Sequence, residues 1–289
     1  MMRRLHGAIA ASVTPMRQGG RAVDVDAFEG LTRFLADGGV DGVLACGTTG
    51  EGVLLDVAER RTVSEAFMAH APEGFDVAVH AGAQTTRDTV ALAAHAQEIG
   101  AAAFAALARW RMSSSSSSGK YGGAITATAA DPLPFYIYEF AGRSGYAIPL
   151  AVVVRVQESA PNVVGMKVSD SPFAAVEPYL GLGLDVFIGS EPLALQGMAA
   201  GAVGSVSGLA AAFPEITASL VHERSEAART HVCRLRDEFA GIPFHAALKE
   251  VLVARDVLVD PAVRAPLRGL DDVESERVLG LFRELLGPS

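Results

Sequence analysis

Lysine is scarce in this chain. Of its 24 basic residues, only Lys120, Lys167 and Lys249 are lysines, and the others are arginines. Chemistry that needs a primary amine therefore has few candidates in these 289 residues.

Cysteine is scarcer still, because only Cys46 and Cys233 are present. They lie far apart and form neither a CxxC motif nor a Cys/His spacing, which excludes a disulfide framework and a zinc site. We expect neither a metal nor a cofactor. The composition is consistent with a reducing compartment and predicts a cytoplasmic protein.

The chain also lacks basic clusters and long apolar runs. The formal net charge is −9 and no basic run is longer than the pairs Arg3-Arg4 and Arg60-Arg61, so binding to nucleic acid or to an anionic membrane is not expected. The longest apolar stretch, around residues 99–108, is too short to span a bilayer. The N-terminal letters MMRRLHGAIAASVTP imitate a signal peptide, but His6 and Gly7 interrupt the apolar run. We expect a soluble protein that begins with a strand and acts on small polar molecules.

Half of the residues are hydrophobic, a fifth are charged and 7% are aromatic, which is ordinary for a globular protein. Short apolar runs predict eight strands, at residues 8–13, 42–46, 76–80, 102–106, 134–138, 163–168, 186–189 and 203–208. Helical spacing predicts helices between them, at residues 26–38, 56–69, 85–99, 149–159, 171–180 and 192–200. The alternation predicts a parallel (β/α)8 TIM barrel. The rival is an open doubly wound sheet, but no GxGxxG follows the first strand.

No convincing strand follows residue 214, and residues 215–239, 243–256 and 271–286 each read as one amphipathic helix. We therefore divide the chain into a barrel, residues 1–213, and residues 214–289, which hold the eighth barrel helix and a C-terminal helical region.

The stretch at residues 109–129, with six consecutive serines, fits no barrel element. It could be a mobile linker, or it could stand in for a different natural sequence with a strand end and an amphipathic helix. We favour the second interpretation, since the chain length there suits one strand and one helix.

Active sites of such barrels lie at the carboxyl ends of the strands. The strand at 163–168 brings Lys167 to that end, and alternation places Lys167 on the same inward face as Val163 and Gly165. The neighbouring strand ends with Tyr138. Taken alone, Lys167 could lie just past the strand and bend into solvent, and Tyr138 could be a core or rim tyrosine.

The second strand runs into GTTGE, residues 47–51. Gly47 and the following residues can turn tightly and present backbone N–H groups and two hydroxyls, which suits a carboxylate or phosphate. The loop is no nucleotide P-loop, because the GK[ST] ending is absent. It could also be a turn without a ligand.

Together these features predict one chemistry. An amine among apolar walls is a good nucleophile, a nearby tyrosine can move protons, and the loop can hold a carboxylate. This is the equipment of a Schiff-base enzyme that acts on a 2-keto acid.

Four motifs resemble the dihydrodipicolinate synthase and N-acetylneuraminate lyase superfamily of class I aldolases. They are GTTGE, the YxxxxRSG pattern from Tyr138 to Gly145, GMK ending at Lys167, and GAVGSVSGLAAAFPE at residues 201–215. The resemblance covers nearly the whole chain except residues 109–129. It implies a TIM barrel that forms a homodimer or homotetramer.

The resemblance assigns roles residue by residue. It implies that Lys167 forms the Schiff base with pyruvate, and that Tyr138 and Thr48 relay protons. It implies that Thr49, with Gly47 in the same loop, binds the pyruvate carboxylate and that the carbonyl of Val206 faces the site. Arg143 matches the arginine that holds the carboxylate of the aldehyde substrate in the synthase branch. The family's second tyrosine, donated across a subunit interface, would fall within residues 109–129, where Tyr121 lies too far along for that role.

The resemblance therefore favours 4-hydroxy-tetrahydrodipicolinate synthase, which condenses pyruvate with aspartate semialdehyde in lysine biosynthesis. Glu139, Phe140 and Ala141 replace the usual Asn, Val and Pro of that branch. A 2-keto-3-deoxy sugar-acid aldolase or dehydratase is the nearest alternative, and its second substrate would be a small aldehyde or keto-sugar acid. A non-catalytic barrel that binds small acids is the alternative of another class.

Overall fold

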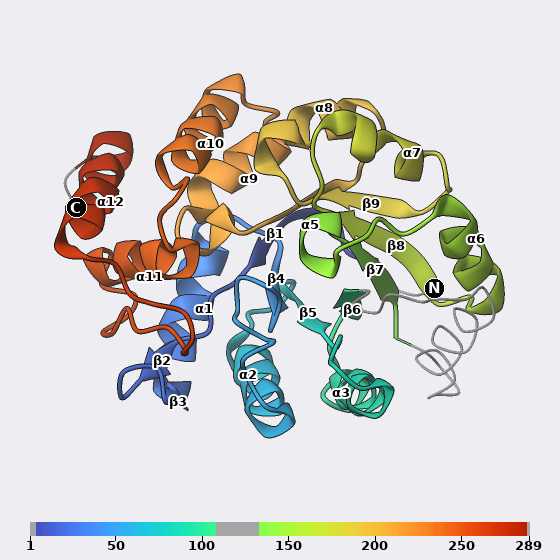
Figure 1. Ribbon diagram of the computed structural model, residues 1–289, viewed down its shortest axis with the longest axis horizontal. Coiled ribbons are helices and arrows are strands. Elements are labelled where there is room, and N and C mark those ends of the chain that lie inside the picture. Colours follow the sequence, from blue (N-terminus) through green and yellow to red (C-terminus); the bar gives the residue numbers. More distant parts are fainter. Residues whose placement is uncertain (1–3, 108–132, 288–289) are drawn as a thin grey trace.

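The computed structural model describes residues 4–107 and 133–287. Their central feature is a closed barrel of parallel strands surrounded by helices, a (β/α)8 TIM barrel as the sequence predicts (Figure 1). The unusual stretch at 109–129, with Lys120 and Tyr121, lies outside the described residues, so the interpretations of it remain predictions.

The barrel strands follow one another in chain order, and the first pairs with the last. Ile9 is the partner of Val206 in the pair that closes the ring. A short antiparallel hairpin, which the sequence analysis did not predict, follows the first strand. The strands are β1 (Gly7–Ala11), β2 (Met16–Arg17), β3 (Ala22–Val23), β4 (Gly42–Ala45), β5 (Asp76–His80), β6 (Ala103–Leu107), β7 (Phe135–Glu139), β8 (Val163–Val168), β9 (Asp185–Ile188) and β10 (Gly204–Ser207).

Helices cover the outside of the barrel, since their buried faces pack on the outward side chains of the strands. None of the helices in the described ranges is both long and apolar enough to cross a membrane. The helices are η1 (Val25–Ala27), α1 (Phe28–Asp37), α2 (Val57–His70), α3 (Thr86–Glu98), α5 (Ala141–Ser144), α6 (Leu150–Ser159), η2 (Phe173–Ala175), α7 (Glu177–Leu180), η3 (Glu191–Leu193), α8 (Ala194–Ala199), η4 (Leu209–Ala211), α9 (Pro214–His222), α10 (Glu226–Glu238), α11 (Phe244–Ala254) and α12 (Asp272–Leu286).

The C-terminal region differs from the sequence prediction in one place. The single helix predicted over residues 215–239 is two helices, α9 and α10. Arg224 takes a left-handed φ of 54° between them, and the Ser225 hydroxyl accepts a hydrogen bond from the Ala228 amide to begin α10. A left-handed residue cannot continue a helix, so the chain turns there.

The inside of the barrel holds its own small apolar cluster, separate from the layer between strands and helices. The pairing of β7 with β8 shifts register between Phe135 and Tyr136. The prediction that Val163 shares the inward face of Lys167 is therefore wrong: Val163 packs in the outer layer, and Val164 belongs to the inner cluster.

Gly165 makes room for an aromatic ring inside the barrel. A Cβ at this position would lie 2.4 Å from the Tyr136 ring, so only glycine fits. The Tyr136 hydroxyl accepts a hydrogen bond from the Leu5 amide at 2.9 Å and closes the amino-terminal end of the barrel. The other end is left to polar side chains.

Candidate active site

Lys167 lies on the inner face of the barrel near the carboxyl end of β8. Its side chain is 7% exposed, and its Cα pairs in register with that of Tyr138. The Nζ atom lies 4.4 Å from the centre of the Tyr138 ring. Below the amine is an apolar cavity of about 20 Å3, lined with Lys167 by Leu5, Ile9, Leu44, Ala78, Phe104, Ala105, Tyr136, Phe187 and Val206. The amine therefore has an apolar floor and an aromatic neighbour.

Tyr138 is fully enclosed and has polar partners around its hydroxyl. Its Oη atom lies 3.5 Å from the Thr48 hydroxyl, and either can donate. Burial alone would raise the pKa of Tyr138, but the charge of Lys167 and hydrogen bonds with Thr48 and Ser169 outweigh it and lower the pKa. The phenol can therefore give up a proton more readily than a free tyrosine.

The loop that carries Thr48 and Thr49 has an unusual backbone. The residues on either side, Cys46 and Glu51, take left-handed φ angles of 56° and 55°. Residues other than glycine rarely adopt such angles. Gly52 packs so tightly that a Cβ would lie 1.8 Å from the Cys46 carbonyl oxygen. The sequence forces a tight turn that holds its two threonines at the end of β4.

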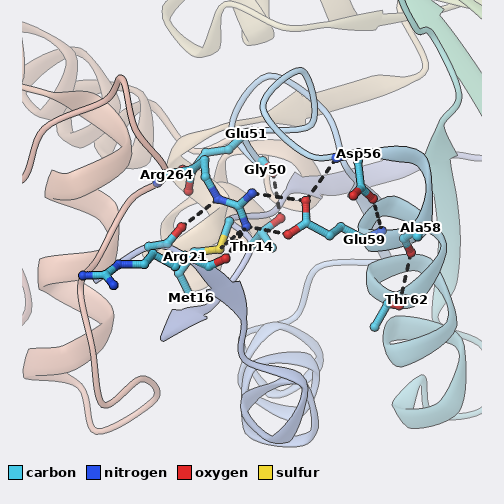
Figure 2. A network of polar contacts seen from close by, with 11 residues as sticks. Thr14, Met16, Arg21, Gly50, Glu51, Asp56, Ala58, Glu59, Thr62 and Arg264 are labelled. Atoms are coloured by element: carbon cyan, nitrogen blue, oxygen red, sulfur yellow. Dashed lines mark hydrogen bonds and ion pairs between the residues drawn. The ribbon is translucent and has the colours of Figure 1, made fainter. Parts of the chain in front are cut away.

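A buried ion pair supports this loop from beneath. Lys249 Nζ donates to Glu51 Oε1 at 2.6 Å and to the Ala262 carbonyl at 2.7 Å, and both charged side chains are fully buried. The other Glu51 oxygen accepts from the Arg264 amide at 2.6 Å. Figure 2 shows Arg264 beside Glu51, with its guanidinium reaching Glu59 on α2. Lys249 is thus committed to structure and is unsuited to bind a substrate.

Replacing Lys249 with methionine is expected to destabilise the fold. The Glu51 carboxylate would stay buried without its cation, a loss of about 3–5 kcal/mol, or roughly 10 °C in melting temperature for a chain of this size. Thermal unfolding followed by circular dichroism measures it. The double variant with Glu51→Gln should recover part of the loss, and a native melting temperature for Lys249→Met alone would show that the pair is dispensable.

His245, at the first turn of α11, was missed by the sequence analysis. Its Nε2 donates to the Thr48 carbonyl at 2.9 Å. Burial lowers the pKa of His245, although the bond to Thr48 opposes this, so the ring stays neutral near pH 7. The contact joins residues 197 positions apart, so no local sequence pattern predicts it.

His80, at the end of β5, was also missed. It is 4% exposed, and its ring meets the Tyr138 ring edge-on at 5.9 Å. The Leu107 amide donates to His80 Nε2 at 3.1 Å. Because His80 ends a barrel strand, the census of strand ends that found Lys167 and Tyr138 could have found it too.

The expected binding residues lie around the same end of the barrel. Thr49 is nearly buried, and a Cβ at Gly208 after β10 would lie 3.2 Å from its hydroxyl. Val206 lines the cavity under Lys167. The Gly47 carbonyl accepts from the Gly52 amide at 3.1 Å, so it serves the turn itself.

Arg143 is carried by the short helix α5 and is exposed. Its guanidinium lies 5.9 Å from the centre of the Phe140 ring, which stacks at 6.3 Å on the Tyr138 ring. Its positive charge also contributes to lowering the pKa of His245. The arginine is thus linked through one aromatic ring to the phenol, and it stands farther out than Lys167.

A closed (β/α)8 barrel with a lysine amine, a phenol and a hydroxyl loop at one end belongs to the class of barrel enzymes. Within the described ranges, His, Cys, Asp and Glu form no group of three suited to a metal ion. The profile of the Dihydrodipicolinate synthetase family matches residues 4–283. The chain belongs to this family, and it is an enzyme of the lyase class.

Named relatives cover the chain almost completely. An "Uncharacterized DapA-like lyase" of Chloroflexus aurantiacus is 29% identical over 97% of each chain. A 4-hydroxy-tetrahydrodipicolinate synthase of Chlorobium phaeobacteroides is also 29% identical, over 98% of each. Among solved structures, the prophage protein YagE of E. coli K12, in complex with pyruvate, superposes with a TM-score of 0.90 at 21% identity over 97% of this chain and 98% of that one. This last likeness concerns the fold.

Proposed function

We propose that the protein is a pyruvate-dependent lyase that works through a Schiff base on Lys167. The observation that carries the proposal is the amine of Lys167 next to the Tyr138 phenol, with the Thr48 hydroxyl beyond it. A nucleophile, a proton carrier and a relay partner thus lie side by side at the carboxyl end of the barrel.

In the first step the Nζ atom of Lys167 attacks the keto carbon of pyruvate. Tyr138 and Thr48 relay the two protons that the Lys167 nitrogen loses to the former carbonyl oxygen, which leaves as water while the carbon–nitrogen double bond forms. The amides and hydroxyl of the Thr49 loop bind the pyruvate carboxylate, as backbone N–H groups in tight turns do for anions.

In the second step the Tyr138 relay moves a proton from the pyruvate methyl to the imine nitrogen, and the resulting enamine carbon bonds to the carbonyl carbon of an aldehyde. The relay then passes the proton from the nitrogen to the aldehyde oxygen. With aspartate semialdehyde, the free amine of the condensed product displaces Lys167 from the imine, which closes a ring and frees the lysine. Tyr138 is the group placed to serve both proton transfers, and its lowered pKa supports that role.

The synthase reaction with aspartate semialdehyde is the activity we favour, and lysine biosynthesis would be its setting. Arg143 supports it, since an exposed guanidinium next to the site can bind the carboxylate of an incoming aldehyde. A synthase of Chlorobium phaeobacteroides covered almost from end to end gives further support. We expect a homodimer or homotetramer in solution.

Replacing Arg143 with alanine is expected to raise the Michaelis constant for a carboxylate-bearing aldehyde about tenfold or more. A charge-assisted hydrogen bond contributes about 1.5–3 kcal/mol, and 1.4 kcal/mol corresponds to a factor of ten. The constant for pyruvate should stay near the native value. Steady-state kinetics with each substrate varied measures both, with the exposed Arg155→Ala on α6 as a matched control. Equal effects on both substrates would indicate a structural role.

A 2-keto-3-deoxy sugar-acid aldolase or dehydratase is the second candidate. Glu139, Phe140 and Ala141 favour it, because they replace the Asn, Val and Pro that the synthase branch usually has after its tyrosine. An activity panel decides between the two: pyruvate is offered with aspartate semialdehyde and with sugar-derived aldehydes, and keto-deoxy acids are offered alone. Turnover of aspartate semialdehyde above all others supports the synthase, and turnover of keto-deoxy acids alone refutes it.

A further inference from the structure

The segment that carries Arg143, residues 140–148, is fastened to the barrel at both ends. The Ala141 amide donates to Asp170 at 2.9 Å, and the Ile148 amide donates to Glu139 Oε2 at 2.9 Å. Glu139 is the last residue of β7, and Asp170 follows β8. Two carboxyl groups from neighbouring strands therefore hold the two ends of one short segment.

A third bond strengthens the far end of the segment. The Tyr179 hydroxyl of α7 donates to the Ile148 carbonyl at 2.7 Å, so both backbone groups of Ile148 are held. Inside the segment, the Ser144 hydroxyl donates to the Tyr146 carbonyl at 2.7 Å. The segment is a small rigid unit whose position depends on its two anchors.

The two carboxyl groups also face each other. Glu139 is fully buried and lies within hydrogen-bonding reach of Asp170. Its Oε1 atom finds no donor within residues 4–107 and 133–287. The titratable groups that face Glu139 are Asp170 from the loop after β8 and the Tyr179 phenol from α7. A proton on Oε1 could be donated to Asp170, and this would satisfy the atom that otherwise has no partner.

Burial, helped by the charge of Asp170, raises the pKa of Glu139 to about 7, although the Ile148 amide acts in the opposite direction. Glu139 therefore changes from mostly protonated to mostly ionised between about pH 6 and pH 8. Once it is ionised, the buried carboxylate of Glu139 faces the half-buried carboxylate of Asp170, and their repulsion strains both anchors of the segment.

We propose that Glu139 and Asp170 form a proton-sharing carboxyl clasp that positions the Arg143 segment, and that the clasp weakens when the shared proton is lost. The inference rests on the proposed function in its choice of readout, because Arg143 is the group expected to hold the second substrate. Neither carboxyl group touches the reacting atoms, so both are positioning residues.

The kinetic test compares the wild type with Glu139→Gln from pH 6 to pH 9. Glutamine keeps the acceptor for Ile148 and offers a permanent donor to Asp170. In the wild type, the Michaelis constant for the carboxylate-bearing aldehyde should rise several-fold above pH 7 while that for pyruvate does not follow. In Glu139→Gln this rise should be absent. The matched control, Glu158→Gln, neutralises an exposed carboxylate on α6 and should keep the wild-type profile.

A second readout needs no substrate. Hydrogen exchange of peptides covering residues 140–148, compared between the two proteins at each pH, should be faster in the wild type above pH 7 and equal at pH 6. The variant Asp170→Asn keeps the acceptor for Ala141 but removes the like charge. The increase in hydrogen exchange with pH should therefore begin at a lower pH in this variant than in the wild type. Identical exchange in the wild type and Glu139→Gln across the range would overturn the clasp. If the exchange difference appears but no aldehyde is turned over, the clasp stands and the proposed function fails.

The ionisation of Glu139 should also change the stability of the fold with pH. The pKa of Glu139 rises from 4.5 to about 7 on folding, so the stability that its neutral form contributes is complete below pH 4.5 and is lost as the pH rises to 7. The melting temperature of Glu139→Gln should therefore gain on the wild type between these two pH values and keep its advantage above pH 7. A constant difference across the range would contradict the proposed ionisation.

Discussion

Replacing Lys167 with arginine is expected to reduce turnover at least about a thousandfold, the scale seen when an essential catalytic group is removed. A guanidinium stays protonated at every accessible pH and cannot attack a ketone. Lys167 is the one lysine in the described residues that lines the barrel interior, because Lys249 is locked in its ion pair. The effect is measured as kcat with the best substrate found in the activity panel described above. Reductive trapping of pyruvate measures it a second way.

The control for Lys167→Arg is Lys167→Met, which has a similar length and no charge. Both variants should keep the far-ultraviolet circular dichroism of the native barrel, and neither should be labelled by pyruvate and borohydride. Retention of a tenth or more of the native activity by Lys167→Arg would contradict the account.

Replacing Tyr138 with phenylalanine is expected to lower kcat by about 10²- to 10⁴-fold, the range for loss of a positioned proton carrier. The ring remains and can still contact Lys167, His80 and Phe140. The change removes the hydroxyl that meets Thr48. Binding of pyruvate should change little, so the loss falls on kcat, which stopped-flow and steady-state kinetics both report.

Tyr136 offers a matched control on the same strand and the same inward face. Its hydroxyl accepts from the Leu5 amide at the opposite end of the barrel. Tyr136→Phe should therefore reduce stability by about 1 kcal/mol and leave kcat near the native value. Equal losses of kcat in the two variants would show that the hydroxyl of Tyr138 has no special role.

Local patterns were enough to predict the barrel and two members of the candidate site. Short apolar runs separated by helical segments located the barrel strands, and the ends of two neighbouring strands placed Lys167 beside Tyr138. The inward position assigned to Val163 was wrong, since a register shift between β7 and β8 changes the face and leaves no mark in the sequence. The division of residues 215–239 into two helices depends on one left-handed residue, Arg224.

The contacts that support the site were beyond reach of the sequence, because they join distant parts of the chain. Glu51 and Lys249 are 198 positions apart. The bond from His245 to Thr48 likewise connects the C-terminal helices with the loop after β4. Such pairs are set by how α11 packs against the loop, and periodicity describes only neighbours along one helix or strand.

Peptide mapping after reductive trapping tests whether Lys167 forms a covalent imine with pyruvate. The native enzyme is incubated with pyruvate and borohydride, digested, and analysed by tandem mass spectrometry. We expect one carboxyethyl group on the Nζ atom of Lys167, with none on Lys249. An adduct on Lys249 or Lys120, or no adduct at all with a folded and active enzyme, would contradict it.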